Sequence, residues 1–165
     1  MQIAWRYHPA GGSPFHATAA LASDGQTAYV PFTTGGGAAA KGTLYAVKAP
    51  PSGQDGQVVW QAELGAGQVQ NSPTVGTDGT IYIVNVPGLL SAIDPNGGRI
   101  KWTAQLGTSG QAQFGQTVKV APAVAPDGTV YAACLTGSLY AVTPPSGNGS
   151  QGTLKWSFDS WIEAA

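Results

Sequence analysis

Short apolar segments recur along the chain, and turn-forming residues separate them. Clear examples are residues 81–84 (Ile-Tyr-Ile-Val), 89–93 (Leu-Leu-Ser-Ala-Ile) and 130–133 (Val-Tyr-Ala-Ala). Segments of this length that are rich in Val, Ile and Tyr and bounded by Gly, Pro and Asp predict β-strands. No stretch has the length and period expected of a helix. The pattern therefore predicts an all-β chain.

A unit of four such segments occurs three times. Each unit has a short leading segment, an Asp-Gly turn that opens a second strand, a Leu-x-Ala strand and a strand that carries Trp. The units cover residues 17–60, 72–102 and 121–156. The Asp-Gly pairs begin at residues 24, 78 and 127, a spacing of about 50 residues that is typical of one four-stranded propeller blade. The differences in length fall in the turns, where insertions leave the strands intact.

One motif resembles a known family. Ala92-x-Asp94-x-x-x-Gly98-x-x-x-Trp102 is similar to the tryptophan-docking signature of the β-propeller repeats named after pyrroloquinoline quinone (PQQ). The segments Ser-Pro-x-Val at 72–75 and Asp-Gly-Thr-Ile-Tyr before residue 83 resemble the rest of that repeat. The resemblance covers nearly the whole chain. It implies a β-propeller of four-stranded antiparallel blades.

The resemblance also implies structural roles for Trp and Ala residues. In the family, the Trp of each outermost strand packs against the signature Ala and a peptide plane of the neighbouring blade. The implied docking residues are Trp60, Trp102 and Trp156, with Ala46, Ala92 and Ala141 as their partners. Lys48 and Thr143 stand where the second repeat has Asp94, and the turns that follow them are longer. We therefore expect a different turn geometry in the first and third repeats.

The repeats divide the chain into three blades and one additional strand. Residues 1–8 contain Trp5 and read as the spare outer strand of an incomplete blade. The predicted blades are residues 9–64, 65–107 and 108–165. Propellers close with about four to eight blades, so three blades leave two apolar faces that need a partner.

Two partners fit this requirement. One is the remaining blades of a longer parent chain. The other is a second copy, since a homodimer would close a six-bladed ring with twofold symmetry. In that ring, we expect the spare strand to pair at the edge of the partner's terminal blade.

Composition narrows the partners further. The net charge is −1, and the seven Lys and Arg residues are scattered, so nucleic acid is not an expected partner. No apolar run of 18 residues is present, so no membrane span is predicted. The first residues lack the order of a signal peptide, but the resemblance implies an extracytoplasmic parent protein, periplasmic or secreted. Cys134 has no second Cys to pair with, and its strand context predicts a buried thiol.

Three functions remain in competition. The favoured one is a non-catalytic scaffold for protein or ligand binding, without a cofactor or a metal. One alternative is a fragment of a quinoprotein dehydrogenase, which the resemblance would equip with calcium-held PQQ, a vicinal Cys pair and an Asp base. This chain has one Cys, and Asp24, Asp78, Asp94 and Asp127 belong to the turns of the repeats. The other alternative is a carbohydrate-facing module of a secreted polysaccharide-active protein, which the many amide side chains permit.

A ligand surface, if present, is expected on the central channel. The innermost strand of each blade lines that channel, and polar residues precede it in the second and third repeats. The candidate ligand-binding residues are Gln70, Asn71, Gln116 and Lys119. We assign no catalytic, cofactor-binding or metal-binding residue.

Overall fold

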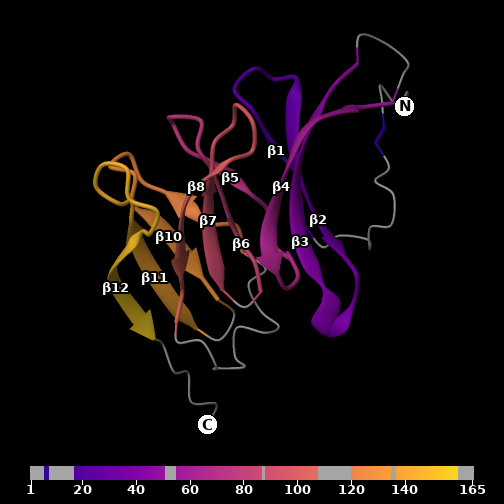
Figure 1. The fold of residues 1–165 in the computed structure, drawn as a ribbon. Coiled ribbons are helices and arrows are strands. Elements are labelled where there is room, and N and C mark those ends of the chain that lie inside the picture. Colours follow the sequence, from indigo (N-terminus) through magenta and orange to yellow (C-terminus); the bar gives the residue numbers. More distant parts are fainter. Residues whose placement is uncertain are drawn as a thin grey trace.

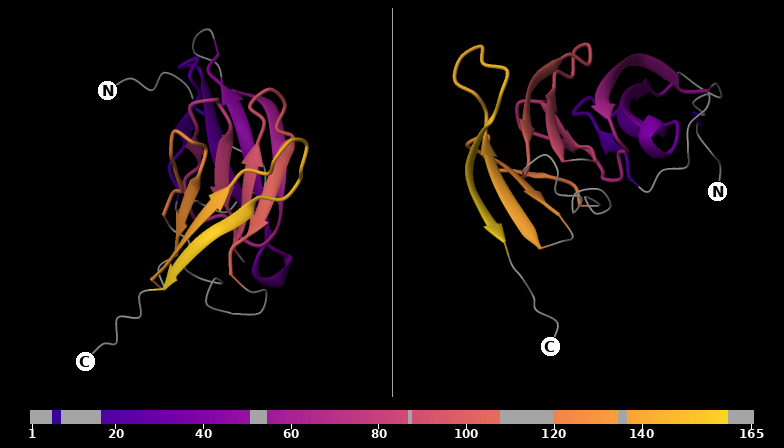
Figure 2. Two further views of the ribbon diagram at one scale, coloured as in Figure 1. Left: turned by 90° about the vertical axis from the view of Figure 1, so that its left-hand side faces the viewer. Right: turned by 60° about the horizontal axis from the view of Figure 1, so that its bottom comes forward.

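Three four-stranded antiparallel sheets stand side by side like the blades of a fan (Figures 1 and 2). The computed structural model describes residues 6–7, 17–50, 55–86, 88–107, 120–134 and 137–159. Blade 1 contains β1 (Ala20–Leu21), β2 (Thr27–Thr34), β3 (Lys41–Lys48) and β4 (Gln57–Ala66). Blade 2 contains β5 (Thr74–Val75), β6 (Ile81–Val84), β7 (Leu89–Ile93) and β8 (Ile100–Gln105). Blade 3 contains β9 (Ala123–Val124), β10 (Val130–Ala133), β11 (Ser138–Thr143) and β12 (Thr153–Asp159).

The predicted all-β architecture is present, with one small addition. A 3-10 turn, η1 (Gly37–Ala39), forms in the insertion between β2 and β3. β4 runs to Ala66, past the blade boundary drawn at residue 64. Of the spare strand expected at residues 1–8, Arg6 and Tyr7 are described, and Trp5 lies outside the described residues.

Each blade is a simple meander in which consecutive strands pair. The second and third strands pair in register, for example Tyr82 with Ala92 in blade 2. A β-bulge follows the signature Ala in every blade, between Ala46 and Val47, Ala92 and Ile93, and Ala141 and Val142. A bulge increases the local twist of a strand. The twist of the outer strand is therefore set at the same place in all three blades.

The Asp-Gly turns have the geometry that their sequence predicts. In blade 2, the Asp78 carboxylate accepts hydrogen bonds from the Thr80 backbone N–H (3.0 Å) and from the Thr80 hydroxyl (2.7 Å). Asp24 and Asp127 make equivalent bonds in their own turns. Gly79 has φ +82°, in the left-handed region that favours glycine. Each turn is thus closed by its own side chain.

The hydrophobic core is two layers, one between each pair of neighbouring blades. Ile81 and Ile83 of β6 face the layer shared with blade 1, and Tyr82 and Val84 face the layer shared with blade 3. All four residues are buried. This explains why β6 is apolar at consecutive positions, because neighbours cover both faces of the middle blade.

The inner strands β1, β5 and β9 bring the three blades together at the narrow end of the fan. Neighbouring inner strands contact each other. The Thr18 backbone N–H donates to Ser72 Oγ (2.8 Å) beside the first of these contacts, and the Thr74 hydroxyl donates to the Pro122 carbonyl beside the second. These bonds hold the blades at a fixed spacing near the expected channel.

Candidate functional site

The seam between blades 1 and 2 is built around Trp60. Its Cα lies opposite that of Ala46 across the β3–β4 pair, and its ring stacks on Tyr29 with 5.7 Å between ring centroids. The indole N–H donates to the Pro95 carbonyl of blade 2 (2.8 Å). The ring also covers Gly98, where an added Cβ would lie 2.5 Å from Trp60 Cε3. A glycine is therefore required beneath this ring.

The seam between blades 2 and 3 repeats this contact with Trp102. Its Cα lies opposite that of Ala92, and a Cβ added at Gly152 would lie 2.7 Å from Trp102 Cζ3. Here the backbone adds two bonds between blades. The Thr103 N–H donates to the Ser150 carbonyl (3.0 Å), and the Gly152 N–H donates to the Thr103 carbonyl (2.9 Å). The long turn of blade 3 thus pairs with β8.

Trp156 holds the same position on blade 3, but no further blade covers it. Its Cα lies opposite that of Ala141, and its ring lies 5.9 Å from that of Tyr131. Its exposed fraction is 41%, against 5% for Trp102. The three Trp–Ala pairs are therefore equivalent within their own sheets and differ in what lies on the other side of the ring.

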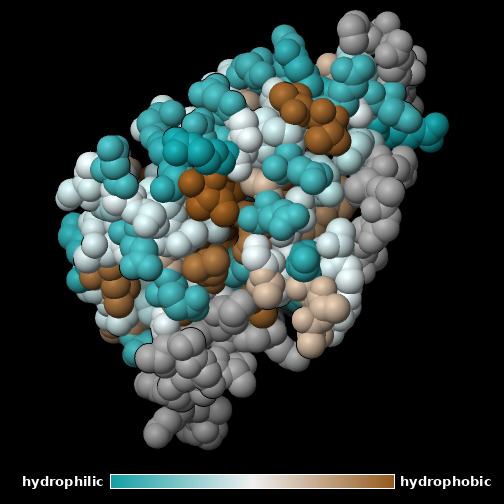
Figure 3. Space-filling view, viewed as in Figure 1, coloured by the Kyte–Doolittle hydropathy of each residue, from teal (hydrophilic) through white to brown (hydrophobic). Residues whose placement is uncertain are grey.

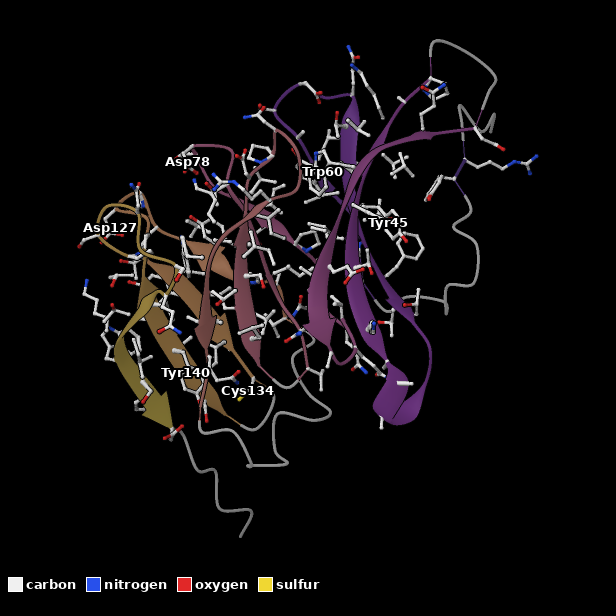
Figure 4. All side chains as sticks on the ribbon, in the orientation of Figure 1. Tyr45, Trp60, Asp78, Asp127, Cys134 and Tyr140 are labelled. Atoms are coloured by element: carbon white, nitrogen blue, oxygen red, sulfur yellow. The ribbon has the colours of Figure 1, made fainter. Side chains whose placement is uncertain are left out.

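An open hollow lies beside each of the two seams, at the end of the blades where the Asp-Gly turns are. Figure 4 shows Asp78, Asp127 and Trp60 toward this end, while Cys134 and Tyr140 lie toward the opposite end. The first hollow, about 440 Å³, is lined by residues that include Asp24, Tyr29, Trp60, Asp78, Pro95 and Asn96. The second, about 400 Å³, is lined by residues that include Asp78, Tyr82, Arg99, Lys101, Trp102 and Asn148. We call this end of the molecule the turn rim.

Asp78 lines both hollows. Its carboxylate forms an ion pair with Lys101 between them. Partial burial opposes its ionisation, but the hydrogen bonds from the Thr80 hydroxyl and N–H and the nearby Lys101 ammonium outweigh burial and lower its pKa below 3.8. Lys101 Nζ lies 3.6 Å from the carboxylate and donates to the Thr80 hydroxyl (2.7 Å). Asp78 is therefore ionised at neutral pH and held in place.

The other two turn carboxylates are also tied to their own backbone. The N–H groups of Gln26 and Thr27 and the Thr27 hydroxyl bond to Asp24 and lower its pKa. The Thr129 N–H, followed by its hydroxyl, lowers the pKa of Asp127 in the same way. These carboxylates act as acceptors that close turns, a role that favours the charged form.

The structure places two of the four candidate channel residues. Gln70 is half-buried, and its Nε2 donates to Gln68 Oε1. Asn71 is fully buried, and its Nδ2 donates to the Val84 carbonyl (2.7 Å). Gln116 and Lys119 lie outside the described residues. Ligand contact by these four residues stays a prediction, and the amide nitrogen of Asn71 serves the backbone of β6.

Asn85 is a buried polar residue whose contacts the sequence did not predict. Asn85 Nδ2 donates to the carbonyls of Leu64 (2.7 Å) and Ala66 (3.1 Å), and its Oδ1 accepts from the Leu89 N–H. It therefore ties the β6–β7 turn of blade 2 to the end of β4 in blade 1. The sequence signal is weak, because an Asn between two Val residues does not reveal which carbonyls it meets.

Cys134 is buried and makes no disulfide, in agreement with the expectation from its strand. Among the residues that the structure describes, no group of three or more His, Cys, Asp or Glu side chains gathers as metal ligands would. Within the same part of the chain, none of the helices has the length and apolar character needed to cross a membrane.

Comparison with known proteins relates this architecture to one family. The family model described as outer membrane protein assembly factor BamB matches residues 2–155. The outer membrane protein assembly factor BamB of Yersinia pestis is 40% identical over 68 residues, which are 41% of this chain and 16% of that protein. The crystal structure of BamB from Moraxella catarrhalis superposes with a TM-score of 0.55 at 19% identity, covering 87% of this chain and 37% of that chain.

These matches differ in what they establish. The structural match shows the propeller fold and confirms the fold class predicted from the repeats. The chain spans well under half of the length of either relative. The family match covers nearly the whole chain and confirms the predicted PQQ-type repeat. The chain therefore belongs to the family described as outer membrane protein assembly factor BamB.

Proposed function

We propose that this chain is part of a non-catalytic propeller scaffold whose turn rim binds other proteins during the assembly of outer membrane proteins. The observation that carries the proposal is the repetition of one hollow at each seam. Each hollow lies beside a Trp that contacts the next blade, and both share the Asp78 turn. A rigid row of similar hollows suits an extended partner that contacts several blades at once.

The composition of the hollows fits a protein partner. Each combines aromatic surface from a seam Trp with carboxylate, amide and backbone groups of the turns. On the face shown in Figure 3, apolar residues form separate patches among hydrophilic ones. Interfaces that form and dissociate commonly have such a mixed surface.

The family match supports both the proposed scaffold role and the proposed location of the parent protein outside the cytoplasm. The family is that of the outer membrane protein assembly factor BamB. We therefore propose that the parent protein acts outside the cytoplasm and that its propeller positions partners without a reaction of its own. The Trp residues and their Ala partners serve this role indirectly, because they fix the spacing of the hollows.

The proposal can be tested with one substitution in each hollow. Asn96 and Asn148 are exposed and line the first and the second hollow. Asn96→Arg with Asn148→Arg should weaken the binding of a fluorescently labelled, unfolded β-barrel outer membrane protein by at least roughly tenfold, which is 1.4 kcal/mol. Fluorescence anisotropy measures the effect.

Gln61→Arg is the matched control, because Gln61 is exposed on β4 and lines neither hollow. It should leave the affinity unchanged. Equal affinity of the double variant and the unmodified chain would overturn the rim as the binding surface. A rise in melting temperature with PQQ and calcium, well above that with calcium alone, would favour the dehydrogenase alternative instead.

A further inference from the structure

The two hollows of the turn rim have similar walls and different charges. In each, an Asp, a Tyr and a Trp come from one blade, and a Pro and an Asn come from a turn of the next blade. Among the described residues that line the first hollow, none is Lys or Arg. Arg99 and Lys101 both line the second hollow. The two hollows therefore offer a partner different charges on a similar frame.

The difference in charge falls at equivalent positions of the repeat. Lys101 and Val59 both directly precede the Trp of their blade, and Arg99 and Gln57 both stand three residues before it. The outer strands β4 and β8 pair with their neighbours in the same register and have their β-bulge at the same place. Blade 2 thus carries two cations at the positions where blade 1 carries an apolar residue and an amide.

The two cations of the second hollow have different surroundings. Lys101 Nζ lies 3.6 Å from the Asp78 carboxylate and donates to the Thr80 hydroxyl (2.7 Å), so its charge is balanced within the hollow. In the part of the chain that the structure describes, none of the ion pairs includes Arg99. The guanidinium of Arg99 is therefore the positive charge of this hollow that no carboxylate of the described chain balances.

The backbone of Arg99 is fixed, and its side chain stands over an aromatic floor. The Asp94 N–H donates to the Arg99 carbonyl (2.8 Å), which closes the short turn before β8. The side chain itself is exposed. Tyr82 and Trp102 line the hollow with 5.9 Å between their ring centroids, and both are almost completely buried. Apolar walls exclude part of the water, so an ion pair formed here is stronger than one on an open surface.

We propose that the second hollow is a subsite for one Asp or Glu side chain of the partner protein, and that the Arg99 guanidinium binds this carboxylate. The proposal rests on the proposed function, because it names a feature of the protein that the turn rim binds. A guanidinium can donate two parallel hydrogen bonds to a carboxylate. The first hollow disfavours an acidic side chain, since Asp24 and Asp78 both line it. An extended partner therefore binds in one register, with its acidic residue at the seam between blades 2 and 3.

The charge of the surrounding rim favours a single carboxylate over an anionic membrane surface. Each of the three turns carries a carboxylate whose lowered pKa keeps it ionised at neutral pH, namely Asp24, Asp78 and Asp127. Figure 4 shows Asp78 and Asp127 toward the same end of the molecule. A surface of anionic lipids would meet these carboxylates together and be repelled. One acidic side chain of a protein can instead contact Arg99 alone.

Fluorescence anisotropy with two labelled peptides tests the subsite on the unmodified chain. Both peptides alternate Thr and Tyr, and they differ only at the central residue, which is Glu in one and Gln in the other. The Glu peptide should bind about fivefold more tightly at low salt, the upper range for an exposed ion pair. The preference should shrink as NaCl is added, because salt screens the pair. Equal affinities at low salt would overturn the proposal.

Substitutions of Arg99 locate the preference. Arg99→Gln should remove it, and Arg99→Glu should reverse it in favour of a peptide with Lys at the centre. Lys155→Gln is the matched control, because Lys155 is exposed, directly precedes Trp156 and lines neither hollow. It removes the same charge and should leave the preference for Glu intact. A preference that survives Arg99→Gln, or that Lys155→Gln abolishes, would contradict the assignment to Arg99.

Two outcomes separate this subsite from the proposed function and from a lipid surface. Equal binding of the two peptides, each weakened by Asn96→Arg with Asn148→Arg, would keep the turn rim as the binding surface and refute the acidic subsite. Sedimentation of the chain with vesicles that contain phosphatidylglycerol, to an extent that falls with Arg99→Gln, would assign Arg99 to lipid phosphate and overturn the proposal. We expect no such sedimentation.

Discussion

Both seams join neighbouring blades, but they do so through different hydrogen bonds. In the first seam, a side chain joins the blades, because the Trp60 indole N–H donates to the Pro95 carbonyl. In the second seam, the backbone joins them, because Thr103 exchanges two hydrogen bonds with the turn that precedes Thr153. In both, a Trp ring rests on a glycine that stands four residues before the next Trp.

Turn length explains the difference. Blade 2 has a short turn that closes on itself, since the Gly98 N–H donates to the Asp94 carbonyl (3.0 Å). The corresponding turn of blade 3 is longer and lays Ser150 and Gly152 along β8. The Trp-on-glycine contact is thus the common element, and the polar bonds adapt to the turn. Substitutions of the Trp or of the glycine beneath it should therefore lower the stability of the fold the most.

Loss of a covered Trp should have the largest effect. Trp102→Ala is expected to lower the free energy of unfolding by about 3–5 kcal/mol, the range for removing a packed aromatic residue. Trp156→Ala should cost only about 1–2 kcal/mol, because a large part of its ring is already in contact with water. Urea denaturation measures both values.

Lys48→Ala is the control for this pair, since Lys48 is exposed at the end of β3. It should change stability by less than about 0.5 kcal/mol. Equal denaturation midpoints for Trp102→Ala and Lys48→Ala would show that the ring does not hold the seam.

A methyl group beneath the ring should have the next largest effect and should distinguish the two seams. Gly152→Ala is expected to cost about 1–3 kcal/mol through overpacking against Trp102. Gly98→Ala should cost about 1–2 kcal/mol more, because Gly98 also has φ +74°. Thermal unfolding of both variants tests the order.

Gly36→Ala provides the reference for these two substitutions. Gly36 has an extended φ of −146°, and nothing lies within 4 Å of an added Cβ. The free energy of unfolding of the Gly36→Ala variant should stay within about 1 kcal/mol of that of the unmodified chain. Similar losses for all three variants would mean that the rings above Gly98 and Gly152 move aside freely.

The smallest effect concerns the carboxylate that the two hollows share. The pKa of Asp78 is lower in the folded chain than its ordinary value of 3.8. The bonds that lower it stabilise the fold above that value, and this contribution is lost as the pH falls through the folded pKa. Denaturation between pH 7 and pH 2 should show a fall in stability below about pH 4.

Asp78→Asn should flatten this decline, because the amide does not titrate. Asp24 and Asp127 also have lowered pKa values and keep part of the dependence in the variant. An equally steep decline with Asp78→Asn would mean that the Asp78 turn gains nothing from the charge of its carboxylate.

The sequence predicted the repeated parts of this fold and missed the parts that differ between repeats. Asp-Gly before Thr80 defines a turn through local bonds, and the consecutive apolar residues of β6 require a covered middle blade, so both could be read from neighbouring residues. The hollows form where turns of two blades meet, and their lining depends on turn lengths. Likewise, the Gly56 N–H donates to the Arg6 carbonyl (2.8 Å). Nothing near Arg6 in the sequence indicates this bond, because it joins segments that are distant in the chain.

The simple strand order within each blade also bears on how the chain folds. Every strand pair joins segments that are neighbours in the sequence, so each blade closes only short loops, and the entropy cost of closing them is small. A blade can therefore assemble as soon as its four strands have left the ribosome, before the next one is synthesised. Each finished blade then offers its Tyr and Trp rings as a template for the blade that follows.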